Sequence, residues 1–251
     1  MRKYVYAGYL LLMLTVGPIA GSVGAEGQSR ADYEQSGKVI WEGKTEKKIV
    51  ALTFDDGPHE IYTPQILDIL AKHHMKATFF VSGSKVSRHP EILRRTFEEG
   101  HEIGNHSYNH IYNRRITSAK LESELLETEK IIHKVTGQKP TLYRPVGGLY
   151  NNMMVETAVK NGYRVVLWSW HQDPKDWRSP GASTIANHII KNLHPGDIIL
   201  LHDWRRNPQT VQALEQITDF LDREGYQCVT VSQMIYQSNP SIPESFFQSV
   251  Q

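Results

Sequence analysis

The strongest constraint on this 251-residue chain is a regular alternation between short apolar runs and longer amphipathic stretches. Several of the runs are rich in β-branched or aromatic residues, which is typical of buried strands. The stretches between them carry apolar residues on one helical face and Glu or Lys on the other, which predicts helices. Seven runs are expected to be strands, namely residues 49–54, 77–81, 102–104, 142–143, 164–168, 197–201 and 227–231.

Strands that alternate with helices predict an α/β protein with a mostly parallel sheet. The alternation continues without a break in composition, so we expect a single barrel-like domain with about seven parallel strands. An open doubly wound sheet is the alternative. The first expected strand is not followed by a glycine-rich phosphate loop, so no motif indicates nucleotide binding.

The two ends of the chain differ from this pattern. Residues 1–25 combine a positive start, an apolar run and small residues before Ala25, which predicts a secretory signal peptide cleaved after Ala25. The alternative is an uncleaved segment that anchors the protein in a membrane. Residues 26–46 are polar and without a period and are expected to be a tether, and residues 239–251 a C-terminal tail. We therefore expect a secreted protein, extracellular or associated with the cell wall.

Charge and cysteine content exclude several classes of protein. Lys and Arg number 28 and Asp and Glu 27, a difference of 28 − 27 = +1, so charge gives no reason to expect a nucleic-acid partner. The single cysteine, Cys228, excludes an intrachain disulfide and a thiolate metal cluster, and its apolar surroundings predict burial. Metal chemistry would have to use the 12 histidines and the carboxylates. We expect a monomer.

Five polar clusters each follow one of the expected strands. Because the carboxyl ends of parallel strands face the same side of a barrel, these clusters are expected to converge on one cleft. They are Asp55-Asp56-Gly57-Pro58, His106-Ser107-Tyr108-Asn109-His110, Arg144-Pro145-Val146-Gly147-Gly148, Asp173-Pro174-Lys175-Asp176-Trp177 and His202-Asp203.

The first two clusters contain the ligand types of a metal site. His106 and His110 are four residues apart, so a helical or turn-like segment would place both rings on one side. With one carboxylate from Asp55-Asp56 they form the set of a hydrolytic zinc site, which keeps a position for water. The same set could hold Fe(II) for oxygen chemistry, although α/β alternation disfavours that class. The other aspartate would be free to act as a general base.

Taken together and in this order, the five clusters resemble the five motifs of the polysaccharide deacetylases. These are the enzymes of carbohydrate esterase family 4, which share the NodB-homology domain. The resemblance covers roughly residues 47–236, and we expect the domain to span residues 47–238. It implies a distorted (β/α) barrel and one divalent metal ion, with Zn²⁺ expected and Co²⁺, Ni²⁺ or Mn²⁺ as alternatives.

The resemblance also implies a role for individual residues. It implies Asp55 as the base, His202 as the acid, Arg144 as the residue that orients the base, and Asp176 as the carboxylate that tunes the acid. The implied metal ligands are Asp56, His106 and His110. The resemblance implies that Trp177 and Leu200, or its neighbour Leu201, form an apolar wall around the acetyl methyl. Pro145 and Gly147 are further candidates for substrate binding, with the backbone N–H of Gly147 at the oxyanion.

One motif departs from the family pattern. Val146 and Gly147 stand where the family usually has a proline and often an aromatic residue before the glycine. The backbone N–H is retained, so the oxyanion contact can be retained. The missing side chain predicts that part of the substrate groove wall is absent, which affects the substrate range more than the reaction type.

The expected function is removal of N-acetyl groups from N-acetylglucosamine-type units of a cell-envelope or related polysaccharide by a secreted, metal-dependent hydrolase. One alternative is an O-acetyl esterase that acts on a xylan-like glycan. Another is a non-catalytic glycan-binding barrel, which the presence of both a base and an acid disfavours. His171, His188 and His194 have no assigned role, and His171 could line the cleft.

Overall fold

The structure is a computed structural model that describes residues 28–113, 115–204 and 208–238. The expected signal peptide and the expected C-terminal tail therefore lie outside the described residues. Within the described part of the chain, no helix is both long and apolar enough to cross a membrane.

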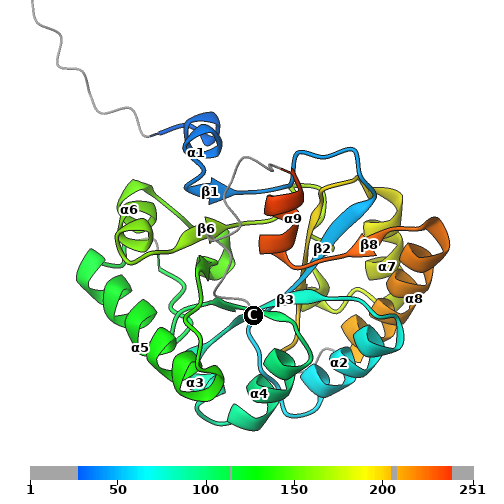
Figure 1. The fold of residues 1–251 in the computed structure, drawn as a ribbon, viewed down its shortest axis with the longest axis horizontal. Coiled ribbons are helices and arrows are strands. Elements are labelled where there is room, and N and C mark those ends of the chain that lie inside the picture. The colour runs from blue at the N-terminus through cyan, green and yellow to red at the C-terminus, as the bar shows by residue number, and fades with distance from the viewer. Residues whose placement is uncertain (1–27, 114, 205–207, 239–251) are drawn as a thin grey trace, which may run out of the picture.

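One curled parallel sheet forms the centre of the molecule (Figure 1). The strand order is β1-β6-β5-β4-β3-β2-β7, and β8 pairs with β2. This arrangement confirms the prediction of an α/β barrel with about seven parallel strands. The strands are β1 (Val39–Ile40), β2 (Ile49–Asp55), β3 (Ala77–Val81), β4 (Glu102–Asn105), β5 (Leu142–Tyr143), β6 (Arg164–Val166), β7 (Ile198–His202) and β8 (Gln227–Cys228).

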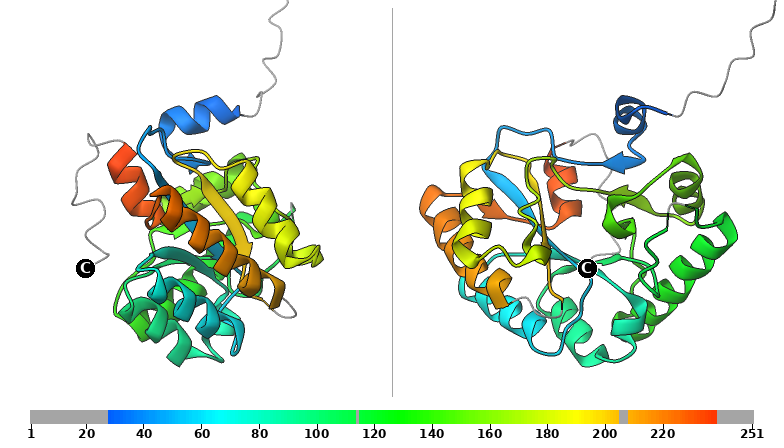
Figure 2. Two further views of the ribbon diagram at one scale, coloured as in Figure 1. Left: turned by 90° about the vertical axis from the view of Figure 1, so that its right-hand side faces the viewer. Right: turned by 180° about the vertical axis from the view of Figure 1, so that it is seen from behind.

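Helices line the outer side of the curled sheet, as the views in Figure 2 show. The connections are therefore β-α-β units, which place the carboxyl ends of the strands at one end of the barrel. The helices are α1 (Arg30–Ser36), α2 (Tyr62–Lys72), α3 (Gly83–Val86), α4 (Pro90–Glu98), α5 (Ser118–Thr136), α6 (Asn152–Lys160), α7 (Ala182–Lys191), α8 (Pro208–Glu224) and α9 (Val231–Ser238), with short 3₁₀ turns η1 (Val146–Gly148) and η2 (Asp176–Arg178).

Strand β2 shows how the sequence positions a functional side chain. All seven of its residues are buried, and successive side chains point to opposite faces of the sheet. Leu52 and Phe54 pack in the outer core with residues of α2, α7 and α8, whereas Ile49 and Ala51 pack inside the barrel with residues of α9. Asp55 shares the inward face with Ile49 and Ala51, so it ends the strand inside the barrel.

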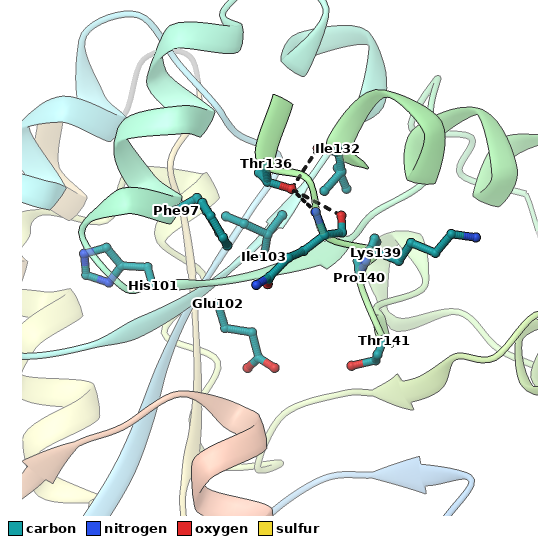
Figure 3. Close-up of a pocket in the computed structure, with 10 residues that line it drawn as sticks. Phe97, His101, Glu102, Ile103, Ile132, Thr136, Lys139, Pro140 and Thr141 are labelled. Carbon is teal, nitrogen blue, oxygen red and sulfur yellow. Dashed lines mark hydrogen bonds between the residues drawn. The ribbon is translucent and has the colours of Figure 1, made fainter. Parts of the chain in front are cut away.

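The other end of the barrel interior is filled. Val231, Met234 and Ile235 of α9 join the inner apolar cluster. Glu102, at the start of β4, accepts hydrogen bonds from the N–H and hydroxyl of Ser232 at the start of α9. A cavity of about 30 Å³ nearby lies beside Glu102 between α4 and α5, and Figure 3 shows its lining. It is large enough for about one water molecule, so it offers no substrate site.

The segment expected to be a polar tether instead contains secondary structure. Residues 30–36 form α1, and residues 39–40 form β1, which pairs with β6 at the edge of the sheet. Tyr33, Val39 and Trp41 are buried at 2%, 1% and 7% exposure. A single short helix and a two-residue strand are too brief to produce a periodic pattern, so they could not be predicted from periodicity.

Irregular chain completes the barrel between β1 and β7. The N–H of Ser169 donates to Ile198 O, and the N–H of Leu200 donates to Gln172 O, each at 3.0 Å. Residues 169–172 therefore run beside β7 without being a regular strand. Strand β6 ends at Val166, whereas the apolar pattern predicted a strand that continues to Trp168.

Candidate active site

The carboxyl end of β2 carries two adjacent aspartates in different conformations. Asp55 is the last strand residue, whereas Asp56 has φ 80, a left-handed conformation that is strained for a side chain with a Cβ. The following turn is held tightly, because a Cβ on Gly57 would lie 2.0 Å from Asp203 Oδ2. The change of direction after Asp55 lets the two neighbouring carboxylates serve different partners.

The histidine cluster follows β4 in a loop with its own supports. The side-chain oxygen of Asn105 accepts a hydrogen bond from the N–H of Ser107 at 2.9 Å. Glu124, a fully buried residue of α5, accepts from the N–H groups of Tyr108 and Asn109 at 3.0 and 2.6 Å. Glu124 thus fixes the loop between the two histidines. Sequence reasoning missed this residue, because in a helical pattern it resembles any other glutamate.

Asp56, His106 and His110 come together although 50 residues separate the aspartate from the first histidine. The Nε2 atoms of His106 and His110 lie 3.4 and 2.7 Å from Asp56 Oδ1. His106 Nδ1 faces Arg144 O at 2.7 Å, so this nitrogen carries the proton and Nε2 is free to bind a metal. Burial raises the pKa of Asp56, but the two imidazoles outweigh burial and hold this pKa well below the usual range.

This cluster fits a divalent cation. One atom from each of the three side chains lies within 4.8 Å of the others. Asp56 Oδ1 is buried and makes no hydrogen bond of good geometry, even though an imidazole nitrogen is 2.7 Å away. A buried carboxylate oxygen left without a hydrogen bond is available to bind a cation. Two imidazoles and a carboxylate are ligands that suit zinc and leave a position for water.

Arg144 holds the other aspartate from inside the barrel. Its side chain is fully buried, and Nη1 donates to Asp55 Oδ1 and Thr53 Oγ1, each at 2.7 Å. Nε donates to the carbonyl of Val166 and Nη2 to the carbonyl of Leu167. Burial lowers the pKa of Arg144, and the Asp55 carboxylate counteracts this effect. The paired guanidinium keeps Asp55 oriented beside the metal cluster, with Asp55 Oδ2 3.9 Å from His106 Nε2.

His202 at the end of β7 has a buried carboxylate partner. Its Nδ1 donates to Asp176 Oδ1 at 2.7 Å, and its backbone N–H donates to Asp176 Oδ2 at 2.9 Å. Burial lowers the pKa of His202, but the Asp176 carboxylate, with smaller contributions from Asp55 and Asp56, raises this pKa to about 9. The imidazole is therefore protonated at neutral pH, with Nε2 left to serve as an acid.

One pocket of about 420 Å³ joins these groups. It brings together the expected residues Asp55, Asp56, His106, His110, Gly147, Trp177, Leu200 and His202. Arg144 and Asp176 lie behind it and act through Asp55 and His202. Pro145 is buried and is not among the lining residues, and Leu201 packs in the outer core.

Five further residues line the pocket and were not assigned to it from the sequence. Tyr112, Val146, Trp168, Asp173 and Trp204 complete its wall. Val146 and Asp173 lie within the motif clusters and Trp204 directly follows one, which is a signal that sequence reasoning could use. Nothing in the sequence marks Tyr112, which lies in the long connection between β4 and α5.

Tyr112 corrects the expectation that part of the groove wall is absent. Gly147 has φ 61, and a Cβ at this position would lie 2.3 Å from the Tyr112 ring. The ring therefore occupies the space beside Gly147 where a side chain at position 147 would begin. An aromatic from a different loop thus takes the place of the aromatic that the third motif lacks.

The pocket of this parallel α/β barrel contains a His-His-Asp cluster, a carboxylate held by an arginine, and a histidine paired with a carboxylate. These groups together define a hydrolase. The family model for polysaccharide deacetylases matches residues 42–166. The chain belongs to the polysaccharide deacetylase family. It is an enzyme of the deacetylase class, which hydrolyses carbon–nitrogen bonds other than peptide bonds.

Individual relatives support this assignment. The chain is 46% identical over 207 residues to a peptidoglycan-N-acetylglucosamine deacetylase of Bacillus cereus, covering 82% of this chain and 97% of that protein. It is 34% identical over 205 residues to the peptidoglycan-N-acetylmuramic acid deacetylase PdaA of Bacillus subtilis, covering 80% and 76%. The crystal structure of the Bc1960 peptidoglycan N-acetylglucosamine deacetylase superposes with a TM-score of 0.78 at 33% identity, covering 82% and 97%.

Proposed function

We propose that this protein is a secreted, zinc-dependent deacetylase that removes N-acetyl groups from N-acetylglucosamine units of bacterial cell-wall peptidoglycan. The observation that carries the proposal is the convergence of Asp55 and His202 on the pocket that contains Asp56, His106 and His110. The 46% identical relative named for peptidoglycan N-acetylglucosamine supports the choice of sugar. Export is inferred from residues 1–25 of the sequence.

Amide hydrolysis requires an activated water, a stabilised oxyanion and a proton for the leaving amine. A divalent cation held by Asp56, His106 and His110 would lower the pKa of a bound water and polarise the acetyl carbonyl. Asp55 accepts the proton of the attacking water, and Arg144 keeps this carboxylate aligned. The backbone N–H of Gly147 is our candidate for an oxyanion donor, and losing such a donor costs about 3 kcal/mol.

His202, which ends β7 next to Asp55 at the end of β2, completes the reaction. Asp176 holds Nδ1, so Nε2 carries the proton that is given to the amine as the C–N bond breaks. Trp177 and Leu200 line the pocket with apolar surface, which suits the methyl group of an acetyl. Base and acid are thus each held by a separate buried partner, Arg144 and Asp176.

The experiment is acetate release from purified peptidoglycan by the full chain, with and without a chelator. We expect release that stops with chelator, returns with Zn²⁺ and disappears in Asp55→Asn. Release from acetylated xylan but not from peptidoglycan would instead support the O-acetyl esterase. If neither glycan releases acetate and Asp55→Asn binds glycan as wild type does, the non-catalytic glycan-binding barrel is the better description.

A further inference from the structure

A second cluster of metal-ligand side chains lies outside the candidate active site. His171, His194 and Asp197 each place one nitrogen or oxygen within 4.8 Å of the others. Among the described residues, this cluster and the Asp56 cluster are the two groups of His, Cys, Asp and Glu with such a spacing. The deacetylase reaction uses none of these three residues.

The atoms of this cluster are spaced as ligands of a shared ion would be. His171 Nε2 lies 2.9 Å from Asp197 Oδ1 and 3.1 Å from His194 Nδ1. Ligand atoms about 2.0–2.1 Å from a tetrahedral zinc ion lie about 3.3 Å from one another. These two separations are close to this value and to the 2.7 and 3.4 Å separations in the Asp56 cluster, whereas His194 Nδ1 lies 4.0 Å from Asp197 Oδ2.

Hydrogen bonding alone serves this arrangement poorly. The nitrogen His171 Nε2 faces two acceptors at once, the Asp197 carboxylate and the ring nitrogen of His194. One proton on His171 Nε2 cannot point well at both, and a second proton on His194 Nδ1 would face the first. A cation between the three atoms would satisfy all of them with both facing nitrogens deprotonated.

Asp197 is held in place as a metal-ligating carboxylate usually is. It is 2% exposed, and its Oδ2 accepts hydrogen bonds from Gln172 Nε2 at 2.9 Å and from the N–H of His194 at 2.8 Å. Its Oδ1 is thereby left to face the imidazole. His188 Nε2 donates to the carbonyl of His171 at 3.0 Å, which fixes the backbone of that ligand. Such supporting hydrogen bonds orient ligands and raise metal affinity.

The cluster is also open to ions. The side chains of His171 and His194 are 33% and 68% exposed, so an ion and its water ligands can enter without any rearrangement. Two imidazoles and a carboxylate favour Zn²⁺ and its transition-metal neighbours over Mg²⁺ or Ca²⁺. We propose that His171, His194 and Asp197 form a second zinc-type metal site in this protein.

The second site is separate from the active site but connected to it by the chain. Asp197 directly precedes β7 and His202 ends it, a distance of about 16 Å at about 3.3 Å per residue. His171 lies two residues before Asp173, which lines the active-site pocket. An ion at the second site would tie the irregular segment after β6 to the start of β7. It would thereby brace one wall of the pocket.

Zinc binding by the chelator-treated full chain tests the proposal, measured by isothermal titration and by metal analysis after gel filtration. The His110→Ala variant removes a ligand of the first site and so isolates the second. We expect this variant to retain one zinc ion per chain and to gain thermal stability on adding Zn²⁺. Adding His194→Ala should abolish both effects, and because His194 is largely exposed this change opens no cavity.

The matched control adds His133→Ala, an exposed histidine of α5, to the same His110→Ala background. This double variant should still bind one zinc ion. Adding His171→Gln in place of His194→Ala should abolish binding as well, which tests a second ligand. The proposal is overturned if His110→Ala binds no zinc, or if the His194→Ala and His133→Ala double variants bind it equally. Because the readout is binding, neither result depends on deacetylase activity.

Discussion

The Nδ1 atom of His202 donates a hydrogen bond of 2.7 Å to Asp176 Oδ1, which joins the end of β7 to η2. Asp176 is fully buried and also accepts from the N–H of His202 and the hydroxyl of Thr210. The carboxylate therefore has one position only. It fixes both the orientation and the charge of the imidazole.

This pair predicts the alkaline limb of the pH–rate profile. The pKa of His202 is raised to about 9, so the acid is protonated at neutral pH and turnover falls as pH rises through about 9. Asp176→Asn removes the charge that raises this pKa, so the fall should move towards the ordinary histidine value of about 6.5. A profile of kcat against pH for both proteins measures the shift. An alkaline limb that Asp176→Asn leaves in place would contradict our choice of acid.

The same shift predicts a pH dependence of stability. The pKa of His202 is higher in the folded state than the value of about 6.5 in an unfolded chain. Its stabilising contribution is therefore fully present below about pH 6.5 and is lost as pH rises towards 9. Denaturant unfolding at pH 6 and pH 9 should show a smaller loss of stability in Asp176→Asn than in wild type. Equal losses would contradict this prediction.

Metal binding and proton donation should separate by mutation. His106→Ala removes a ligand, so zinc bound at this site and activity should be lost together. His202→Ala removes only the acid, so zinc content should stay unchanged while kcat falls by about 10²–10⁴. Metal analysis and acetate release on the same samples measure both. A near-wild-type rate in His202→Ala would show that another group supplies the proton.

Glu124 should support the metal through the loop and not by direct contact. It accepts hydrogen bonds from two backbone N–H groups between His106 and His110. Glu124→Ala frees this loop, and loss of such support weakens metal affinity by about 10–100-fold. Glu127→Ala, an exposed change on the same helix, is the matched control. Equal zinc affinities for the two variants, measured by competition with a chelator, would remove Glu124 from this role.

Tyr112 and Gly147 should be coupled in substrate binding. Tyr112→Ala removes an aromatic wall and should raise KM for the glycan by about two- to tenfold, with a smaller effect on kcat. Gly147→Ala is strained at φ 61 and displaces the ring, so it should also weaken binding. In the double variant the two losses should not add, because the displaced ring is already absent. Additive losses would show that Gly147→Ala weakens binding independently of the Tyr112 ring.

Much of the fold was readable from periodicity. Burial on both faces of the sheet makes each strand a short apolar run, so strands such as Ala77–Val81 were found with their observed bounds. Long helices such as Pro208–Glu224 follow the amphipathic pattern expected between the strands, because one face packs on the sheet and the other meets solvent. The helix and strand within residues 30–40 were missed, since such short elements are stabilised by contacts with the sheet and not by a local pattern.

The sequence by itself determined the motif residues and their order, because polar side chains after buried strands must gather at one end of a parallel barrel. Only the tertiary structure decided how they divide the work. It turned Asp55 towards Arg144 and Asp56 towards the histidines, and it buried Asp176 behind His202. It also brought Tyr112 to Gly147 and His171 to Asp197. Such pairings depend on the paths of the loops and on the backbone direction at single residues. Both are determined by contacts between residues that are distant in the sequence.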